Sequence, residues 1–187
     1  MNTTIATAKP RLSVKTQTIA TIAAIIGAVL LPQIFHVMGA VSGIGTALGV
    51  SFLPMHLPII LVGLLAGPYA GTIAGVCGPL FSFALSGMPG IAMLPFMMVE
   101  LCAYGLFAGL LRNVKLTTIA KVLIVQVAGR VVYAAALLFA FYVLGNQAAN
   151  VASVWKSLPV GIFGLALQWV LLPLVVFWVE NTRTEES

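Results

Sequence analysis

Residues 52–111 are apolar almost throughout and contain one acid, Glu100, and no lysine or arginine. Soluble proteins carry about 25% charged residues, so water cannot be the solvent for most of a stretch this long. The whole chain has the same character, with 61% hydrophobic and 7% charged residues and a mean hydropathy of +1.13. The sequence therefore predicts an integral membrane protein.

The length of the chain limits the number of membrane crossings. A spanning helix takes about 20 apolar residues, so 187 residues leave room for about six helices with their connections. We predict an all-α integral membrane protein with six transmembrane helices in a single bundle, at 17–35, 57–66, 69–85, 91–111, 118–144 and 157–179. The expected organisation is a cytoplasmic N-terminal segment at 1–16, a six-helix membrane domain at 17–180 and a cytoplasmic tail at 181–187.

Small residues recur at four-residue spacing in two of these segments. Gly67, Gly71 and Gly75 would lie on one helix face, where they allow a neighbouring backbone to approach closely. The first helix carries an alanine stripe, defined as Ala20, Ala24 and Ala28. Two interpretations of the alanine stripe stay open: tight packing inside the bundle, or a docking face for a partner helix.

The basic residues predict the orientation. With six helices, one side of the membrane collects seven bases and the other side only Lys156; the seven are Lys9, Arg11, Lys15, Arg112, Lys115, Lys121 and Arg183. By the positive-inside rule both termini are cytoplasmic, in a bacterial cell membrane, and the loops at 36–56, 86–90 and 145–156 are external. The uncharged connection at 36–55 is long for a loop, and such loops often act as lids over binding sites.

Three polar side chains are expected at similar depth inside the membrane: Glu100, Arg130 and Gln168. Charged residues at that depth normally face a partner or a wet cavity and mark a functional site. Glu100 and Arg130 could form a structural ion pair or could bind a substrate, and both alternatives stay open. Their neighbours on the same predicted helices and His56, which lies just before the second predicted helix, complete the candidate substrate-binding residues: Arg130, Glu100, His56, Gln126, Tyr133, Gln168 and Trp169.

Catalytic and metal-binding motifs are absent from the sequence. It contains no HExxH, no GxSxG and no phosphate-binding lysine loop, and two isolated histidines do not make a metal triad. We therefore expect no catalytic residues, no cofactor and no metal. The net charge of +5 sits at the ends of hydrophobic segments, so it predicts membrane topology and not nucleic-acid binding.

The sequence contains a central block of motifs: Pro54-Met55-His56-Leu57-Pro58, Gly67-Pro68, Gly71, Gly75, Pro79-Leu80, Ser86-Gly87-Met88-Pro89, Glu100-Leu101, Tyr104-Gly105 and Gly109-Leu110. Together with the alanine stripe, these motifs cover most of the chain, and through them it resembles the substrate-binding S components of energy-coupling factor (ECF) vitamin transporters. The resemblance implies six helices and a vitamin site in the external half, under the first, third and fifth loops. It also implies that the alanine stripe docks on a membrane coupling subunit, which assembles with two cytoplasmic ATPases.

The favoured function is a substrate-specific binding subunit of an ECF-type ABC transporter that imports a small water-soluble vitamin or precursor. Pantothenate leads the candidates, because its carboxylate suits Arg130, ahead of pyridoxine-like compounds, hydroxymethylpyrimidine and folate. Two alternatives are a membrane-embedded transferase and a structural membrane protein. A transferase is disfavoured because it needs clustered acids or histidines, and Glu100 is the only acid before residue 180.

Overall fold

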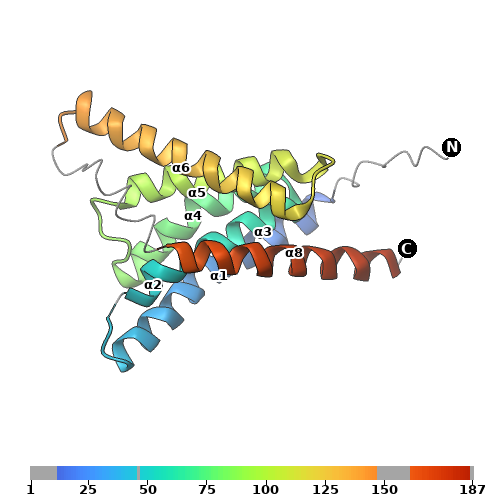
Figure 1. The fold of residues 1–187 in the computed structure, drawn as a ribbon, viewed down its shortest axis with the longest axis horizontal. Coiled ribbons are helices and arrows are strands. Elements are labelled where there is room, and N and C mark those ends of the chain that lie inside the picture. Colours follow the sequence, from blue (N-terminus) through green and yellow to red (C-terminus); the bar gives the residue numbers. More distant parts are fainter. Residues whose placement is uncertain (1–11, 46, 147–160, 186–187) are drawn as a thin grey trace.

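In the computed structural model, which describes residues 12–45, 47–146 and 161–185, helices pack side by side in one bundle (Figure 1). The described elements are α1 (Val14–Val41), α2 (Ala47–Phe52), α3 (His56–Ala66), α4 (Pro68–Ser86), α5 (Leu94–Leu110), the 3₁₀ turn η1 (Leu111–Asn113), α6 (Thr118–Tyr142) and α8 (Ile162–Glu185). No strand occurs among these residues. The predicted all-α class is confirmed.

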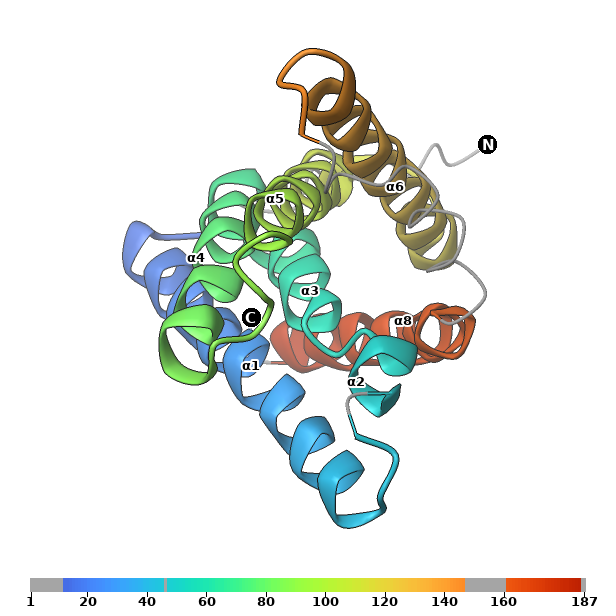
Figure 2. The ribbon, with the colours of Figure 1, turned by 90° about the vertical axis from the view of Figure 1, so that its left-hand side faces the viewer.

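Among the described residues, five helices are long and apolar enough to cross a membrane: α1, α4, α5, α6 and α8. The second predicted span, α3, is equally apolar but has only 11 residues. At about 1.5 Å per residue it is too short to cross the hydrocarbon layer alone. Viewed along the bundle, α3 lies in the middle, with α1, α4, α5, α6 and α8 around it (Figure 2).

The first helix is longer than predicted. We expected it to end at Phe35, but α1 continues to Val41, so His36 belongs to a helix and not to a connection. No proline interrupts residues 36–41, and inside a membrane a helix is the cheapest way to satisfy backbone polar groups. The helix stops where Gly43 and Gly45 adopt positive φ values of 75° and 59°, which glycine tolerates best.

Other helix boundaries follow local capping chemistry. The Thr117 hydroxyl accepts a hydrogen bond from the backbone N–H of Ala120 (3.3 Å) and so begins α6. Gly67 has φ 105° and separates α3 from α4, with Pro68 at the first turn of the new helix. The last helix runs beyond its predicted end at residue 179 to Glu185, and its predicted first residues, 157–160, lie outside the described residues.

The crossing that contains α3 is broken. After α2, Leu53 has a left-handed φ of 47°, unusual for a residue with a side chain, and α3 starts three residues later at His56. Non-helical backbone at membrane depth is tolerated where it is buried in protein or lines a cavity. The break at residues 53–55 therefore indicates a cavity beside it.

Glycines bring α4 and α5 into close contact, as their spacing predicted. A Cβ added at Gly71 would collide with the backbone of Gly105, and one added at Gly75 would collide with Leu101. Gly67, the remaining glycine of the predicted face, instead forms the turn before α4. This close approach is typical of small-residue interfaces in membranes, and it fixes the position of α5, which carries Glu100.

The alanine stripe of α1 lies mostly inside the bundle. Ala24 and Ala28 are 7% and 0% exposed, and Ala20 is half-buried at the edge of the same core. Ala28 packs against Gly78 of α4, where a Cβ would come within 3.1 Å of the alanine methyl. The outward face of α1 carries larger apolar side chains such as Ile22 and Ile26, both 52% exposed. These positions agree with the packing interpretation for Ala24 and Ala28.

The α4–α5 contact yields a prediction for stability. Gly105→Ala should lower the free energy of unfolding by about 1–3 kcal/mol, because its methyl group overpacks against Gly71. The control is Gly90→Ala, since nothing lies within 4 Å of a Cβ at Gly90. Thermal unfolding in detergent measures both. Equal melting temperatures for Gly105→Ala and the parent protein would contradict the close contact.

Candidate functional site

A pocket of about 330 Å³ opens beside the break between α2 and α3. Small-molecule sites typically enclose about 300–1,000 Å³, so one small compound would fill it. The break, the α4–α5 loop and residues of all six helices from α1 to α6 form its walls: Pro32, His36, Gly49, Leu53, Pro54, Met55, His56, Ser82, Met88, Pro89, Gly90, Met93, Met97, Glu100, Arg130 and Tyr133.

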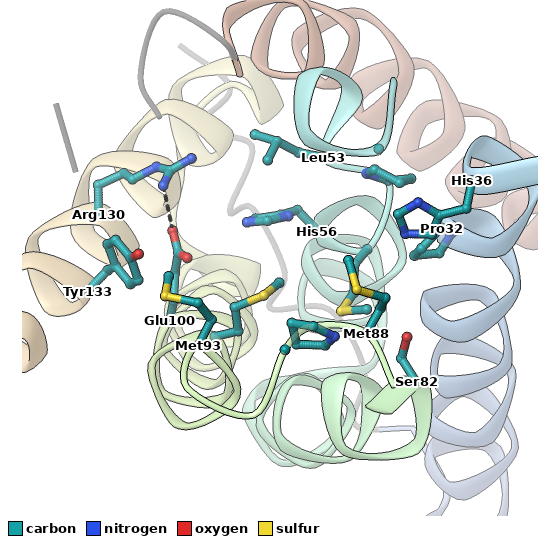
Figure 3. A pocket seen from close by; sticks show the side chains of 16 residues that line it. Pro32, His36, Leu53, His56, Ser82, Met88, Met93, Glu100, Arg130 and Tyr133 are labelled. Atoms are coloured by element: carbon teal, nitrogen blue, oxygen red, sulfur yellow. Dashed lines mark ion pairs between the residues drawn. The ribbon is translucent and has the colours of Figure 1, made fainter. Parts of the chain in front are cut away.

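The pocket has two facing sides. Figure 3 shows Arg130, Tyr133 and Glu100 on one side, Pro32, His36 and Ser82 on the other, and His56 between them. Four of the seven predicted binding residues therefore line one pocket: His56, Glu100, Arg130 and Tyr133. Their binding role stays a prediction, but the fold brings them together from α3, α5 and α6.

An ion pair forms the first side of the pocket. Arg130 Nη1 lies 3.1 Å from Glu100 Oε1, and the two side chains are 15% and 5% exposed (Figure 3). The Tyr104 hydroxyl, one turn along α5, donates a hydrogen bond to the same Oε1 (3.1 Å). The carboxylate is thus held by a cation and a phenol, which is how a buried charge becomes tolerable in a low-dielectric interior.

A glycine on α6 makes this geometry possible. A Cβ at Gly129 would collide with the ring of Tyr104, so only glycine lets α6 come this close to α5. Gly129 immediately precedes Arg130, and the close approach carries the guanidinium to Glu100. Tyr104 itself is 0% exposed and is therefore part of the core.

His56, the first residue of α3, is buried in the pocket wall with 4% exposure. Its ring meets Tyr104 edge to face, with centroids 5.1 Å apart. Within the described part of the chain, neither ring nitrogen has a hydrogen-bond partner. Such an unpaired group costs about 1–3 kcal/mol when buried. His56 is therefore a polar group that is held in place and lacks a partner.

The remaining predicted binding residues form a separate cluster between α6 and α8. Gln126 Nε2 donates to Gln168 Oε1 (3.0 Å), and Trp169 Nε1 donates to Gln126 Oε1 (2.7 Å). None of the three is among the residues that line the pocket. Gln168 was expected at the depth of Glu100 and Arg130, but its amide pairs across the helix interface. Interhelical amide bonds of this kind hold membrane helices together.

The sequence analysis missed the methionines. Met55 lines the pocket from the α2–α3 break, and Met88, Met93 and Met97 line it from the α4–α5 loop and the start of α5. Methionines in an apolar stretch look like any other core residue, so only the fold shows that they converge. It also missed His36, because the predicted connection began there. The His36 ring lies against Gly49 of α2, and its buried Nδ1 has no hydrogen bond to any described residue.

Two of the three predicted loops contribute to the pocket. Residues 53–55 belong to the first loop region, and residues 88–90 to the second. Most of the third, at 145–156, lies outside the described residues. Among the described residues, no group of three or more histidine, cysteine, aspartate or glutamate side chains gathers as a metal site would require.

The pocket can therefore bind a small molecule between the Glu100–Arg130 ion pair and the apolar methionine side chains. Comparison with known families gives a match: the family described as "ECF transporter, substrate-specific component" matches residues 17–176. No curated protein and no solved structure matches the chain at a significant level.

The ion pair yields a second prediction. Arg130→Met or Glu100→Met should each destabilise the protein by about 3–5 kcal/mol, because each leaves one buried charge alone. The double variant should recover much of this loss, since it removes both charges. Thermal unfolding of the three variants in detergent is the measurement. A double variant as unstable as the sum of the single ones would show that the two charges are not coupled.

Proposed function

Since the chain belongs to the family of ECF transporter substrate-specific components, we propose that it is the subunit that captures a small water-soluble vitamin or precursor for import. Members of this family are transport subunits and not enzymes. The observation that carries the proposal is the pocket beside Glu100 and Arg130. It combines a suitable volume with His56, whose buried ring nitrogens have no hydrogen-bond partner among the described residues.

The family also implies the partners. A substrate-specific component works with the coupling and ATPase subunits of an ECF transporter. We propose two ATPases and docking of the coupling subunit on α1. Because Ala24 and Ala28 are buried, docking through the alanine stripe would require α1 to shift, whereas Ala20 and the outer face with Ile22 and Ile26 are accessible without a shift. Membrane lipid would cover the remaining outer faces.

Pantothenate, the candidate favoured by the sequence, would bind through its carboxylate. The planar guanidinium of Arg130 suits a carboxylate, since it can form two parallel hydrogen bonds. The Arg130 guanidinium would then have to contact both the ligand carboxylate and Glu100 Oε1. Pyridoxine-like compounds, hydroxymethylpyrimidine and folate are the other proposed cargoes.

The competing functions lack support from the described residues. A transferase would need acids or histidines around a reacting centre, and Glu100 is engaged by Arg130 and Tyr104. A purely structural membrane protein would have no use for a pocket with an unpaired buried imidazole.

Co-expression tests the proposed function. The protein, produced with the ECF coupling and ATPase subunits of its host, should purify as one complex in mild detergent. Native mass spectrometry should find one small molecule bound to it. His56→Phe keeps the ring contact with Tyr104 but removes both nitrogens, so it should retain the complex and lose about tenfold in ligand affinity. Failure to form any complex, with no bound small molecule, would overturn the proposal.

We further propose that the pocket opens to the outside and that both termini are cytoplasmic, because seven bases lie on one predicted side and one on the other. The start of α1 and the end of α8 lie at the same end of the bundle, and the α4–α5 loop lies at the opposite end (Figure 1).

Cysteine labelling tests this orientation. In a background without Cys77 and Cys102, Ser42→Cys should react with an impermeant maleimide on intact cells, because Ser42 lies exposed near the pocket end. Lys115→Cys, exposed after η1, should react only after permeabilisation. The reverse pattern would invert the topology.

A further inference from the structure

The charges that line the pocket cancel. Among the lining residues that the structure describes, Glu100 and Arg130 are the only acid and the only lysine or arginine, and they face each other at 3.1 Å. A ligand with a net charge would bring a third, unbalanced charge into a site of low dielectric constant, which is costly. A neutral ligand avoids this cost.

The side of the pocket formed by Glu100 and Arg130 can still form hydrogen bonds with a ligand. Both contacts to the Glu100 carboxylate end on Oε1, which leaves Oε2 for a donor. Arg130 Nε is buried and has no acceptor within the described residues. Neutral His56 adds one donor and one acceptor beside them. A ligand that satisfies these groups must itself present a donor and an acceptor close together.

The four methionines that line the pocket suit a flat ring. Met55, Met88, Met93 and Met97 are unbranched and polarizable, and thioethers make favourable contacts with aromatic rings. Their rotatable bonds also let them move aside for a ring whose edge contacts His56 and Arg130, which line the same pocket. Pro32, Pro54 and Pro89 supply stiffer apolar surface around them.

We propose that the substrate is a neutral, flat heteroaromatic ring that carries a hydrogen-bond donor next to an acceptor, as in an aminopyrimidine or a hydroxypyridine. This inference rests on the proposed function. The ring donor binds Glu100 Oε2, the adjacent acceptor takes a hydrogen bond from Arg130 or His56, and the ring faces pack on the methionines. Glu100 selects the ring through its donor, and Arg130, 3.1 Å from Glu100 Oε1, holds the carboxyl group in position.

An acyclic carboxylate such as pantothenate fits this arrangement less well. It would pull Arg130 away from Glu100 and leave the two carboxylates facing each other. Removing the charge of Glu100 therefore changes the affinities for the two ligand classes differently. Glu100→Gln weakens a neutral ring that donates to the carboxylate, and it strengthens or does not change an anion that needs Arg130.

Calorimetric titration of the detergent-solubilised full chain tests the proposal with matched probes. These are pyridoxine, its carboxylate analogue 4-pyridoxate, 4-amino-5-hydroxymethyl-2-methylpyrimidine and pantothenate. At least one neutral ring should bind about 100-fold more tightly than either anion, and Glu100→Gln should weaken that ring by about 10–100-fold. Met97→Ala should weaken it as well, whereas Met38→Ala, at an exposed site on α1 outside the pocket, should not.

Several outcomes would overturn the ring proposal. They are tighter binding of pantothenate or 4-pyridoxate than of both neutral rings, a gain in ring affinity in Glu100→Gln, or no binding of either ring at about 1 mM. If Glu100→Gln does not fold, the order of the four affinities in the parent protein and the Met97→Ala comparison still decide. Assembly with the coupling and ATPase subunits is measured separately, so a protein that assembles and binds pantothenate would keep the proposed function and lose only the ring.

Discussion

The ion pair between Glu100 and Arg130 is the constraint on which the rest of the bundle depends. Neither charge could stay at this depth alone, because an isolated charge in a membrane interior is costly. Holding them 3.1 Å apart requires α5 and α6 to approach closely, which Gly129 permits by making room for Tyr104. Tyr104 in turn donates to the carboxylate, so one contact between helices both packs the bundle and completes the ion pair.

The sequence predicted the parts of the fold that depend on local chemistry. Apolar length and turn residues were enough for the helices, and four-residue glycine spacing was enough for the face of α4 that meets α5 at Gly71. Depth counting brought Glu100 and Arg130 to the same level, but it could not decide between ion pair and ligand contact. In the structure they pair with each other.

What the sequence could not predict depends on contacts between distant segments. Depth alone grouped Gln168 with Glu100, yet rotation about the axis of α8 turns its amide to Gln126. Helical periodicity is a weak guide when a helix is apolar on every face, and these helices are. For the same reason the sequence did not reveal the methionines of the pocket, which come together only when the α4–α5 loop and the α2–α3 break line one pocket. The extension of α1 to Val41 was missed because small residues can end a helix in water but not as readily in a membrane.

The unpaired polar atoms explain why a ligand would matter to this protein. His56 and Arg130 Nε are buried without hydrogen bonds in the described structure, and each such group costs about 1–3 kcal/mol. A bound molecule that pairs with them would remove that cost and add apolar contacts with the methionines.

The left-handed Leu53 lies in the wall of the same pocket, at the junction between α2 and α3. Because strained backbone of this kind persists only where surrounding contacts hold it, α2 is the part of the wall whose position depends most on what fills the pocket. Ligand binding would therefore stabilise the end of the bundle around residues 47–56 more than its opposite end, where Lys121 Nζ already donates to the carbonyl of Arg112 (3.0 Å).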